Sequence, residues 1–281
     1  MNELDYRKIK GIRSSQLKNM LTSPAYAKYK MDNPTDSTDA LILGEAVHCL
    51  MLEPHNFEDK LAVRPVTDKG RAVASNTKQF KKWAELNEGK TFITEAQLAQ
   101  AKAMVNGAFQ NRKIREHIDS LVEVEGLWTW EEDGITFKCR FDGIGKDSGE
   151  TFLSDVKTTS KLKEYLFMKS AISFGYDLQC YMYKQGALHN NYDIKKVFIP
   201  AVSSTKGQFE GVLYELTPEF LAVGERRFKE AVALYRHCMD TGEWPGYKDN
   251  MVVPLYPPSY LEEIDDDEDE DEDDFDIPDL R

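Results

Sequence analysis

The sequence predicts an α+β domain with a mixed central sheet flanked by helices, followed by a disordered acidic C-terminal tail. Three observations lead to this fold class. The first third of the chain carries helix signals, the middle carries strand signals around a tight turn, and two more strands precede a last long helix. The chain has 281 residues, of which 41% are apolar, so it is long enough to bury a substantial core.

Capping residues and prolines mark the predicted helices. A serine can cap a first helix, a Ser-Pro pair opens a second, and an aspartate can cap a third that a proline ends. Thr94 and Gln97 have the spacing of a capping box, which indicates one long helix. We therefore expect helices from Ser14 or Ser15 to about Leu21, from Ser23-Pro24 to Lys30, from Asp39 to Pro54 and from Thr94 toward Ile118.

Strand signals begin around Asp133-Gly134, a dipeptide that favours a tight hairpin turn. Residues 127–132 and 135–144 flank it, and Asp142 alternates onto the same face as Arg140 and Lys138. The remaining expected elements are a third strand over 151–158, helical segments to about His189, strands over 197–203 and 208–216, and a helix from Thr217-Pro218 to Thr241-Gly242.

The net charge of −13 comes from the C-terminal tail. Residues 262–281 hold 14 of the 49 acidic residues and one of the 36 basic residues, and 265–274 are ten acids in a row. Such a run cannot bury enough apolar surface to fold alone. We therefore predict a folded domain over 1–261 with no net charge, which permits a basic groove, and a disordered tail over 262–281.

Other features exclude several classes of protein. The chain has no run of about 18 apolar residues and no apolar N-terminal segment, which predicts a cytoplasmic protein without a membrane span. The four cysteines are far apart in the sequence and form no CxxC pair. We therefore expect neither a structural zinc site nor a disulfide framework, and we interpret the cysteines as small buried hydrophobic residues.

The segment Ser154-Asp155-Val156-Lys157 carries the candidate chemistry. In a strand, Asp155 and Lys157 lie on one face and Val156 points the other way. If the preceding strand brings Asp142 close to Asp155, the two carboxylates repel each other unless a divalent cation lies between them. Oxygen ligands of this kind suit magnesium or manganese. Lys157 can then orient or deprotonate a water, or stabilise charge on a phosphate; the alternative is a simple ion pair with Asp155.

Further motifs accompany this segment in a fixed order. They are Gly44-Glu45-Ala46-Val47-His48, Arg140-Phe141-Asp142-Gly143, Ser154-Asp155-Val156-Lys157-Thr158-Thr159, and Gln179 with Tyr183. Together these motifs resemble the RecB-like branch of the PD-(D/E)XK nucleases. The segments 11–18, 23–25, 50–54 and 243–247 are similar to the catalytic region of the RecE-type (exodeoxyribonuclease VIII) exonucleases of prophage recombination systems, so the resemblance spans about residues 11–250.

The resemblance implies a fold like that of RecB and lambda exonuclease, and a role for individual residues. The implied metal ligands are the side chains of His48, Asp142 and Asp155 and the backbone carbonyl of Val156. Lys157 would be the catalytic lysine. Gln179 and Tyr183 would lie beside the active site, where they hydrogen-bond phosphate or hold the lysine in place. Without these companions, His48 would be an ordinary core histidine, and Gln179 and Tyr183 would be core packing.

The resemblance also implies an activity, which is magnesium-dependent 5′-to-3′ exonuclease action on double-stranded DNA ends. The product would carry 3′ single-stranded tails for recombination and annealing, and the phage-type enzyme would form a ring-shaped homo-oligomer. Two alternatives stay open. One is a PD-(D/E)XK endonuclease, although the cysteine pattern disfavours relatives with an iron-sulfur cluster. The other is an inactive DNA-binding module whose acidic tail mimics DNA or binds a partner.

Several charged residues have two interpretations each. Glu45 is interpreted as solvated, with a role as an extra metal ligand as the alternative. Candidates for phosphate contact, or simply solvated surface, are Arg13, Ser14, Lys18, Lys69, Arg71, Lys78, Lys81 and Lys82. Phe275, Ile277 and Leu280 lie within the acidic tail, which is similar to the acidic tip of bacterial single-strand DNA-binding proteins. This likeness predicts that the tail binds a single-strand annealing protein, and a solvated tail is the alternative.

Overall fold

A computed structural model describes residues 8–34 and 38–256. Of the described residues, those up to Tyr247 form one compact unit, and those from Lys248 to Tyr256 belong to a second. The first unit combines helices with a mixed sheet, which confirms the predicted α+β class. The predicted acidic tail, 262–281, lies outside the described residues.

A long hairpin forms one side of the central sheet. Strands β3 (Leu121–Glu132) and β4 (Ile135–Asp147) pair antiparallel from Glu132 and Ile135 outward. Asp133 and Gly134 form the turn between them, and their positive φ values of 48° and 76° are those of the predicted tight turn. The predicted hairpin is therefore confirmed, with both strands longer than expected.

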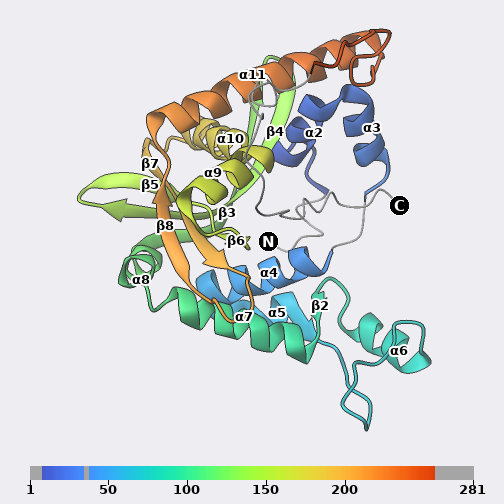
Figure 1. The fold of residues 1–281 in the computed structure, drawn as a ribbon, viewed down its shortest axis with the longest axis vertical. Helices are drawn as coiled ribbons and strands as arrows, with labels where there is room; N and C mark the ends of the chain where they lie inside the picture. The colour runs from blue at the N-terminus through green and yellow to red at the C-terminus, as the bar shows by residue number, and fades with distance from the viewer. Residues whose placement is uncertain (1–7, 35–37, 257–281) are drawn as a thin grey trace, which may run out of the picture. The chain divides into compact units, whose positions relative to one another are not determined.

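The remaining strands make the sheet mixed. β5 (Glu150–Ser154) pairs antiparallel with β4 and parallel with β7 (Ile194–Ser203). β6 (Lys157–Thr159) is also parallel to β7, and β8 (Gly211–Glu215) is antiparallel to it. The order along the sheet is β3-β4-β5-β7-β6, with β8 paired to β7 (Figure 1).

The prediction of one continuous strand over 151–158 is wrong, because the strand is interrupted between Ser154 and Lys157, although the Asp155 N–H still donates to the Phe198 carbonyl of β7. The two parts keep one register along β7, since Ser154 lies opposite Phe198 and Lys157 lies opposite Ala201. The physical reason is the Val156 N–H, which donates to the carboxylate of Asp142 instead of to a strand. The interruption thus brings the Val156 N–H and the Asp155 and Lys157 side chains close to Asp142.

Three helices begin near the N-terminus and follow the predicted segments. They are α2 (Ser14–Thr22), α3 (Pro24–Asp32) and α4 (Asp39–Leu52). Ser23 caps α3 as predicted, with its hydroxyl accepting from the Tyr26 N–H at 3.1 Å. The predicted caps of the other two helices are wrong by one residue, since Arg13 is the N-cap of α2 and Thr38 caps α4.

The predicted long helix after Thr94 is two helices, α7 (Glu95–Ala108) and α8 (Arg112–Asp119). The capping box is confirmed, because Thr94 and Gln97 each accept a hydrogen bond from the other's backbone N–H. The helix divides at Asn111, whose side chain accepts from the Lys113 N–H at 2.9 Å and so starts a new helix.

The C-terminal half adds α9 (Glu164–Ser173), α10 (Tyr176–His189) and α11 (Pro218–Thr241), all within predicted segments. Gly242 ends α11 in the left-handed conformation, as its place after the helix predicted. The sequence did not predict the elements between α4 and α7. These are the 3₁₀ helix η1 (Pro54–Asn56), α5 (Phe57–Lys60), β1 (Leu61–Val63), α6 (Lys78–Leu86) and β2 (Thr91–Ile93), with β1 parallel to β2.

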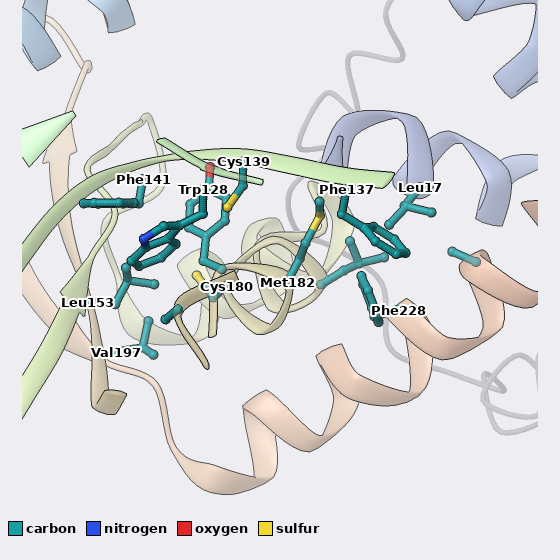
Figure 2. Packing of buried hydrophobic residues seen from close by; sticks show 14 of the residues in the cluster. Leu17, Trp128, Phe137, Cys139, Phe141, Leu153, Cys180, Met182, Val197 and Phe228 are labelled. Carbon is teal, nitrogen blue, oxygen red and sulfur yellow. The ribbon is translucent and has the colours of Figure 1, made fainter. Parts of the chain in front are cut away.

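Buried apolar residues form two clusters that hold the sheet between helices. The larger one lies between β4 and the helices α10 and α11, and Figure 2 shows Phe137 and Cys139 beside Cys180, Met182 and Phe228. The smaller one joins α4 and α7 to β7. A sheet packed on two sides is a rigid platform for side chains at its strand ends.

All four cysteines are buried and free, as predicted. Within 8–34 and 38–256, no helix combines the length and the apolar character needed to cross a membrane.

Candidate metal centre and active site

His48, on α4, lies between two carboxylates. Its Nε2 is 2.9 Å from Asp142 Oδ2, and its Nδ1 is 2.8 Å from Glu125 Oε1. Burial opposes the charged ring, but the charges of Asp142 and Glu125 and their hydrogen bonds outweigh it and raise the pKa of His48 to about 10. The imidazolium therefore donates to both carboxylates, and His48 belongs to a charged cluster instead of the apolar core.

Asp142, on β4, is the point where three segments meet. The pairing of Gly143 with Ser154 places Asp142 next to the chain interruption that follows β5. Its Oδ2 accepts a hydrogen bond from the Val156 N–H at 2.7 Å and also faces His48. Burial would raise the pKa of Asp142, but the nearby positive charge of His48 lowers it below its usual range. Asp142 is therefore ionised at neutral pH.

Asp155 and Lys157 lie side by side, as the predicted alternation requires. Lys157 Nζ is 2.5 Å from Asp155 Oδ2, and the Asp155 side chain is about 1% exposed. Apart from this ion pair, neither oxygen of Asp155 has a hydrogen-bond partner within the described residues. Burial raises the pKa of Asp155, whereas the charges of Asp155 and Asp142 raise the pKa of Lys157 although burial opposes this. Asp155 thus keeps unused lone pairs in a buried position.

Glu125 is the site residue that the sequence analysis missed. It lies on β3 eight residues before Asp133, and Asp142 lies eight residues after Gly134. The paired residues Val124 with Gly143 and Gly126 with Phe141 flank the two acids, so they are cross-strand neighbours. Like charges in this position repel each other. Besides His48, two cations lie near Glu125, with Arg140 Nε at 3.3 Å and Lys60 Nζ at 3.6 Å from Oε2. Counting outward from Asp133-Gly134 would have found Glu125 from the sequence.

The side chains present fit a divalent cation. One ligand atom each from His48, Glu125 and Asp142 lie within 4.8 Å of one another. Imidazole nitrogen and carboxylate oxygen are atoms that bind such ions. Asp155, which pairs with Lys157, also interacts electrostatically with Asp142 of the same cluster. The Val156 N–H makes the contact with Asp142. The Val156 carbonyl as a ligand stays a prediction.

Gln179 and Tyr183 lie one turn apart on α10, as predicted. Gln179 Nε2 donates to the Tyr183 hydroxyl at 2.7 Å. Burial raises the pKa of Tyr183 well above its usual value, and the charges of Asp155 and Asp142 raise it further. The tyrosine therefore stays a neutral hydroxyl close to the acidic cluster, and a direct role toward phosphate or Lys157 stays a prediction.

A second lysine approaches the site from α2. Lys18 Nζ donates to the Phe174 carbonyl at 2.9 Å, and burial followed by the charge of Lys157 lowers the pKa of Lys18 to about 8. A cavity of about 210 Å³ opens nearby on α2 and β4. Its lining residues are Arg13, Ser14, Ser15, Lys138, Cys139, Arg140 and Tyr183.

The other basic candidates do not lie in this cluster. They belong to the segment between β1 and β2 and are Lys69, Arg71, Lys78, Lys81 and Lys82, all exposed. Glu45 is exposed on α4, where its Oε2 accepts from the Thr91 hydroxyl at 2.7 Å. This position agrees with the interpretation of Glu45 as a surface residue.

Comparisons with known proteins agree with this architecture. No curated protein sequence matches the chain. Among solved structures, an exonuclease candidate from Eubacterium rectale has 14% identity and a TM-score of 0.58, over 93% of this chain and 95% of that one. A phage-related exonuclease from Haemophilus somnus 129PT has 13% identity and a TM-score of 0.33, over 85% of this chain and 100% of that one. The first of these likenesses shows a shared fold.

A family model covers most of the chain. It describes a PDDEXK-like domain of unknown function (DUF3799) and matches residues 13–252. This range contains His48, Glu125, Asp142, Asp155 and Lys157, together with the strands and helices that position them. The chain therefore belongs to the family of PDDEXK-like domains of unknown function.

Proposed function

We propose that this chain is a divalent-metal-dependent nuclease that hydrolyses double-stranded DNA from its ends. One observation carries the proposal, namely the convergence of His48, Asp142 and the Asp155–Lys157 pair at one interrupted strand. Asp142 and Asp155 are buried carboxylates that His48 and Lys157 compensate here, and a divalent cation would compensate the same charges. Phosphodiester hydrolysis is the chemistry that such a carboxylate cluster with an adjacent lysine supports in the PD-(D/E)XK fold.

In this proposal His48 gives up a ring proton, and its freed nitrogen, Asp142 and Asp155 hold the ion, with the Val156 carbonyl as a further ligand. Glu125 joins them because its carboxylate lies in the same cluster. Magnesium is the expected ion and manganese the alternative; either one would supply positive charge that acidifies a water and neutralises developing charge on the phosphate. Lys157 is protonated in the ion pair, which favours a role as a cation beside the phosphate over a role as a proton acceptor.

We further propose 5′-to-3′ polarity, products with 3′ single-stranded tails for recombination, and assembly as a ring-shaped oligomer. This polarity, this product and this oligomeric state are what the resemblance to RecE-type exonucleases implies. The acidic tail is proposed to bind a single-strand annealing protein, and the domain is proposed to end near residue 261. The fold shared with the Eubacterium rectale structure, which is named as an exonuclease, supports DNA as the substrate.

The test uses linear duplexes labelled at either end and closed circular DNA, each with and without Mg²⁺. Metal-dependent release of the 5′ label, with intact closed circles, is the expected result. Cleavage of closed circles would favour the endonuclease alternative. Binding of duplex DNA without hydrolysis in Mg²⁺ or Mn²⁺ would favour an inactive binding module.

A further inference from the structure

A basic arm leaves the body between β1 and β2. We define the arm as residues 64–90, which connect the two short parallel strands and contain α6. Figure 1 shows α6 and the loop before it lying outside the layers formed by the sheet and its covering helices. The arm does not contribute to either of the buried clusters of the body except through its root.

The arm is a folded element with its own small core. The rings of Phe80 and Trp83 have centroids 5.5 Å apart, and both pack on Phe92 of β2. The guanidinium of Arg64 lies 4.7 Å from the centre of the Phe80 ring and donates to the Val73 carbonyl at 2.8 Å. These contacts hold α6 and the loop in a defined position, so the charges on the arm are presented as a fixed surface.

The arm is basic, in a domain whose total charge is zero. It holds seven basic residues and three acidic ones, whereas residues 1–261 together have no net charge. Lys78, Lys81 and Lys82 share one face of α6 and are exposed. Throughout the described part of the chain, none of these three lysines forms an ion pair, and neither do Lys69 and Arg71. Unpaired positive charge is therefore concentrated on this element.

Both ends of the arm are fixed beside the candidate metal centre. At one end, Lys60 directly before β1 places its Nζ 3.6 Å from Glu125 Oε2 and also pairs with Glu53 at the end of α4. At the other end, Thr91 donates to Glu45, which lies on α4 three residues before His48. A polyanion with one phosphate at the metal centre would therefore have its neighbouring phosphates near the root of the arm.

We propose that the arm is a second DNA-binding surface, on which Lys78, Lys81 and Lys82 contact backbone phosphates of the duplex that extends from the active site. That the bound polyanion is DNA rests on the proposed nuclease function. The contacts are independent of base sequence, because lysine ammonium groups bind phosphates as point charges. An apolar protein partner is disfavoured, because Val66 and Leu86 are the only exposed large apolar side chains among the described residues of the arm.

The experiment compares two triple variants with the wild-type chain. The arm variant is Lys78→Gln, Lys81→Gln and Lys82→Gln, in which glutamine preserves helix propensity. The matched control is Lys113→Gln, Lys146→Gln and Lys229→Gln, which removes three exposed lysines from α8, β4 and α11. Both change the net charge equally. Thermal unfolding checks that each variant keeps its fold.

Duplex binding is measured by fluorescence anisotropy in EDTA over a range of salt concentrations, so that hydrolysis does not enter. The arm variant should bind roughly tenfold more weakly at low salt, and its slope of log affinity against log salt should fall by about 0.9 for each lysine that contacts a phosphate. The control should keep the wild-type slope. Hydrolysis of bis(p-nitrophenyl) phosphate with Mn²⁺, a substrate too small to reach α6, should be equal in all three proteins.

Equal affinities and slopes for the arm variant and the control would overturn the proposal. A change in oligomeric state of the arm variant, with unchanged duplex affinity per chain, would overturn it in favour of an interface between copies. Failure of the proposed nuclease function gives a different pattern: the wild-type chain then hydrolyses neither DNA nor the small diester, while the salt slope still reports on the arm.

Discussion

Glu125 Oε1 lies 2.8 Å from His48 Nδ1, which joins β3 to α4 through two side chains that no sequence motif connects. The contact gives the histidine two carboxylate partners, because Asp142 faces its other nitrogen. The candidate metal ligands therefore include Glu125, which was not among the ligands that the motifs predicted.

The first prediction tests Glu125. Glu125→Gln keeps the shape of the side chain but removes its charge, so the nuclease should need roughly tenfold or more Mg²⁺ to reach half its maximal rate, and high Mn²⁺ should restore activity. Glu123→Gln is the matched control, because Glu123 is on the same strand and accepts from the Tyr192 hydroxyl outside the cluster. An unchanged metal dependence for Glu125→Gln would remove this residue from the site.

The second prediction concerns the two aspartates. Mg²⁺ or Mn²⁺ should raise the Tm of the wild-type chain, since a ligand that binds only the native state stabilises it by about 2.7 kcal/mol at a hundred times its Kd. Asp142→Asn and Asp155→Asn should each abolish hydrolysis and lose this rise. Calorimetry with and without metal provides the measurement. A full metal-induced rise in either variant would contradict its role as a ligand.

The third prediction separates catalysis from ion pairing at Lys157. Lys157 Nζ lies 2.5 Å from Asp155 Oδ2, so the lysine and an ion bound at that oxygen would compete for it. Lys157→Met should therefore lower turnover at saturating metal by at least about a hundredfold while leaving metal affinity equal or tighter. Near-normal turnover together with a lower Tm would mean that Lys157 is a structural ion-pair partner.

The fourth prediction uses His117, which is buried against Phe152 and Phe198 with its Nε2 2.8 Å from Ser154 Oγ. Burial lowers the pKa of His117 to about 4, from 6.5 in the unfolded chain. The folded state then binds fewer protons than the unfolded state, so this stabilisation is complete above pH 6.5 and is lost as the pH falls toward 4.

The loss amounts to an unfolding free energy of order 3 kcal/mol for a shift of this size. Denaturant unfolding between pH 7 and pH 4 measures it, with His117→Gln as the comparison, because glutamine does not titrate. The variant should show a flatter dependence on pH than the wild-type chain. Parallel curves for the two proteins would show that other groups cause the acid sensitivity.

The fifth prediction concerns the acidic tail. Deletion of the residues after Leu261 removes 14 acids and one base, which changes the net charge from −13 to zero. We expect hydrolysis to continue, duplex affinity to rise at low salt and the gain to shrink as salt screens it. Contact with a single-strand annealing protein should be lost. Unchanged DNA affinity and unchanged capture of that protein would reduce the tail to a solubilising segment.

The sequence was sufficient for the parts of the fold that have local signals. Asp133-Gly134 predicted the hairpin, and Thr94 with Gln97 predicted the start of α7, because turn and cap chemistry act over a few residues. The closeness of Asp142 to Asp155 and Lys157 followed from alternation and from the short connection between neighbouring strands. The place of His48 on α4 beside Asp142 came only from the resemblance.

The parts that could not be predicted depend on contacts between distant residues. The break in the helix at Asn111 and the interruption of the strand at Val156 each arise from one side-chain hydrogen bond. β1 and β2 have three residues each, too few for alternation to be visible, and they exist because they pair with each other. The small aromatic core of the arm likewise joins Phe80 to Phe92 across a loop.

Glu125 has a φ of 55°, so an acidic residue with a β-carbon stands in the left-handed region within a strand. This conformation costs about 1 kcal/mol for such a residue, and glycine adopts it freely. The ion pairs of Glu125 with His48, Arg140 and Lys60 hold this conformation in place. Glycine here would relieve the backbone but leave three cations without their carboxylate, so the strain and the charge cluster are expected to be lost together.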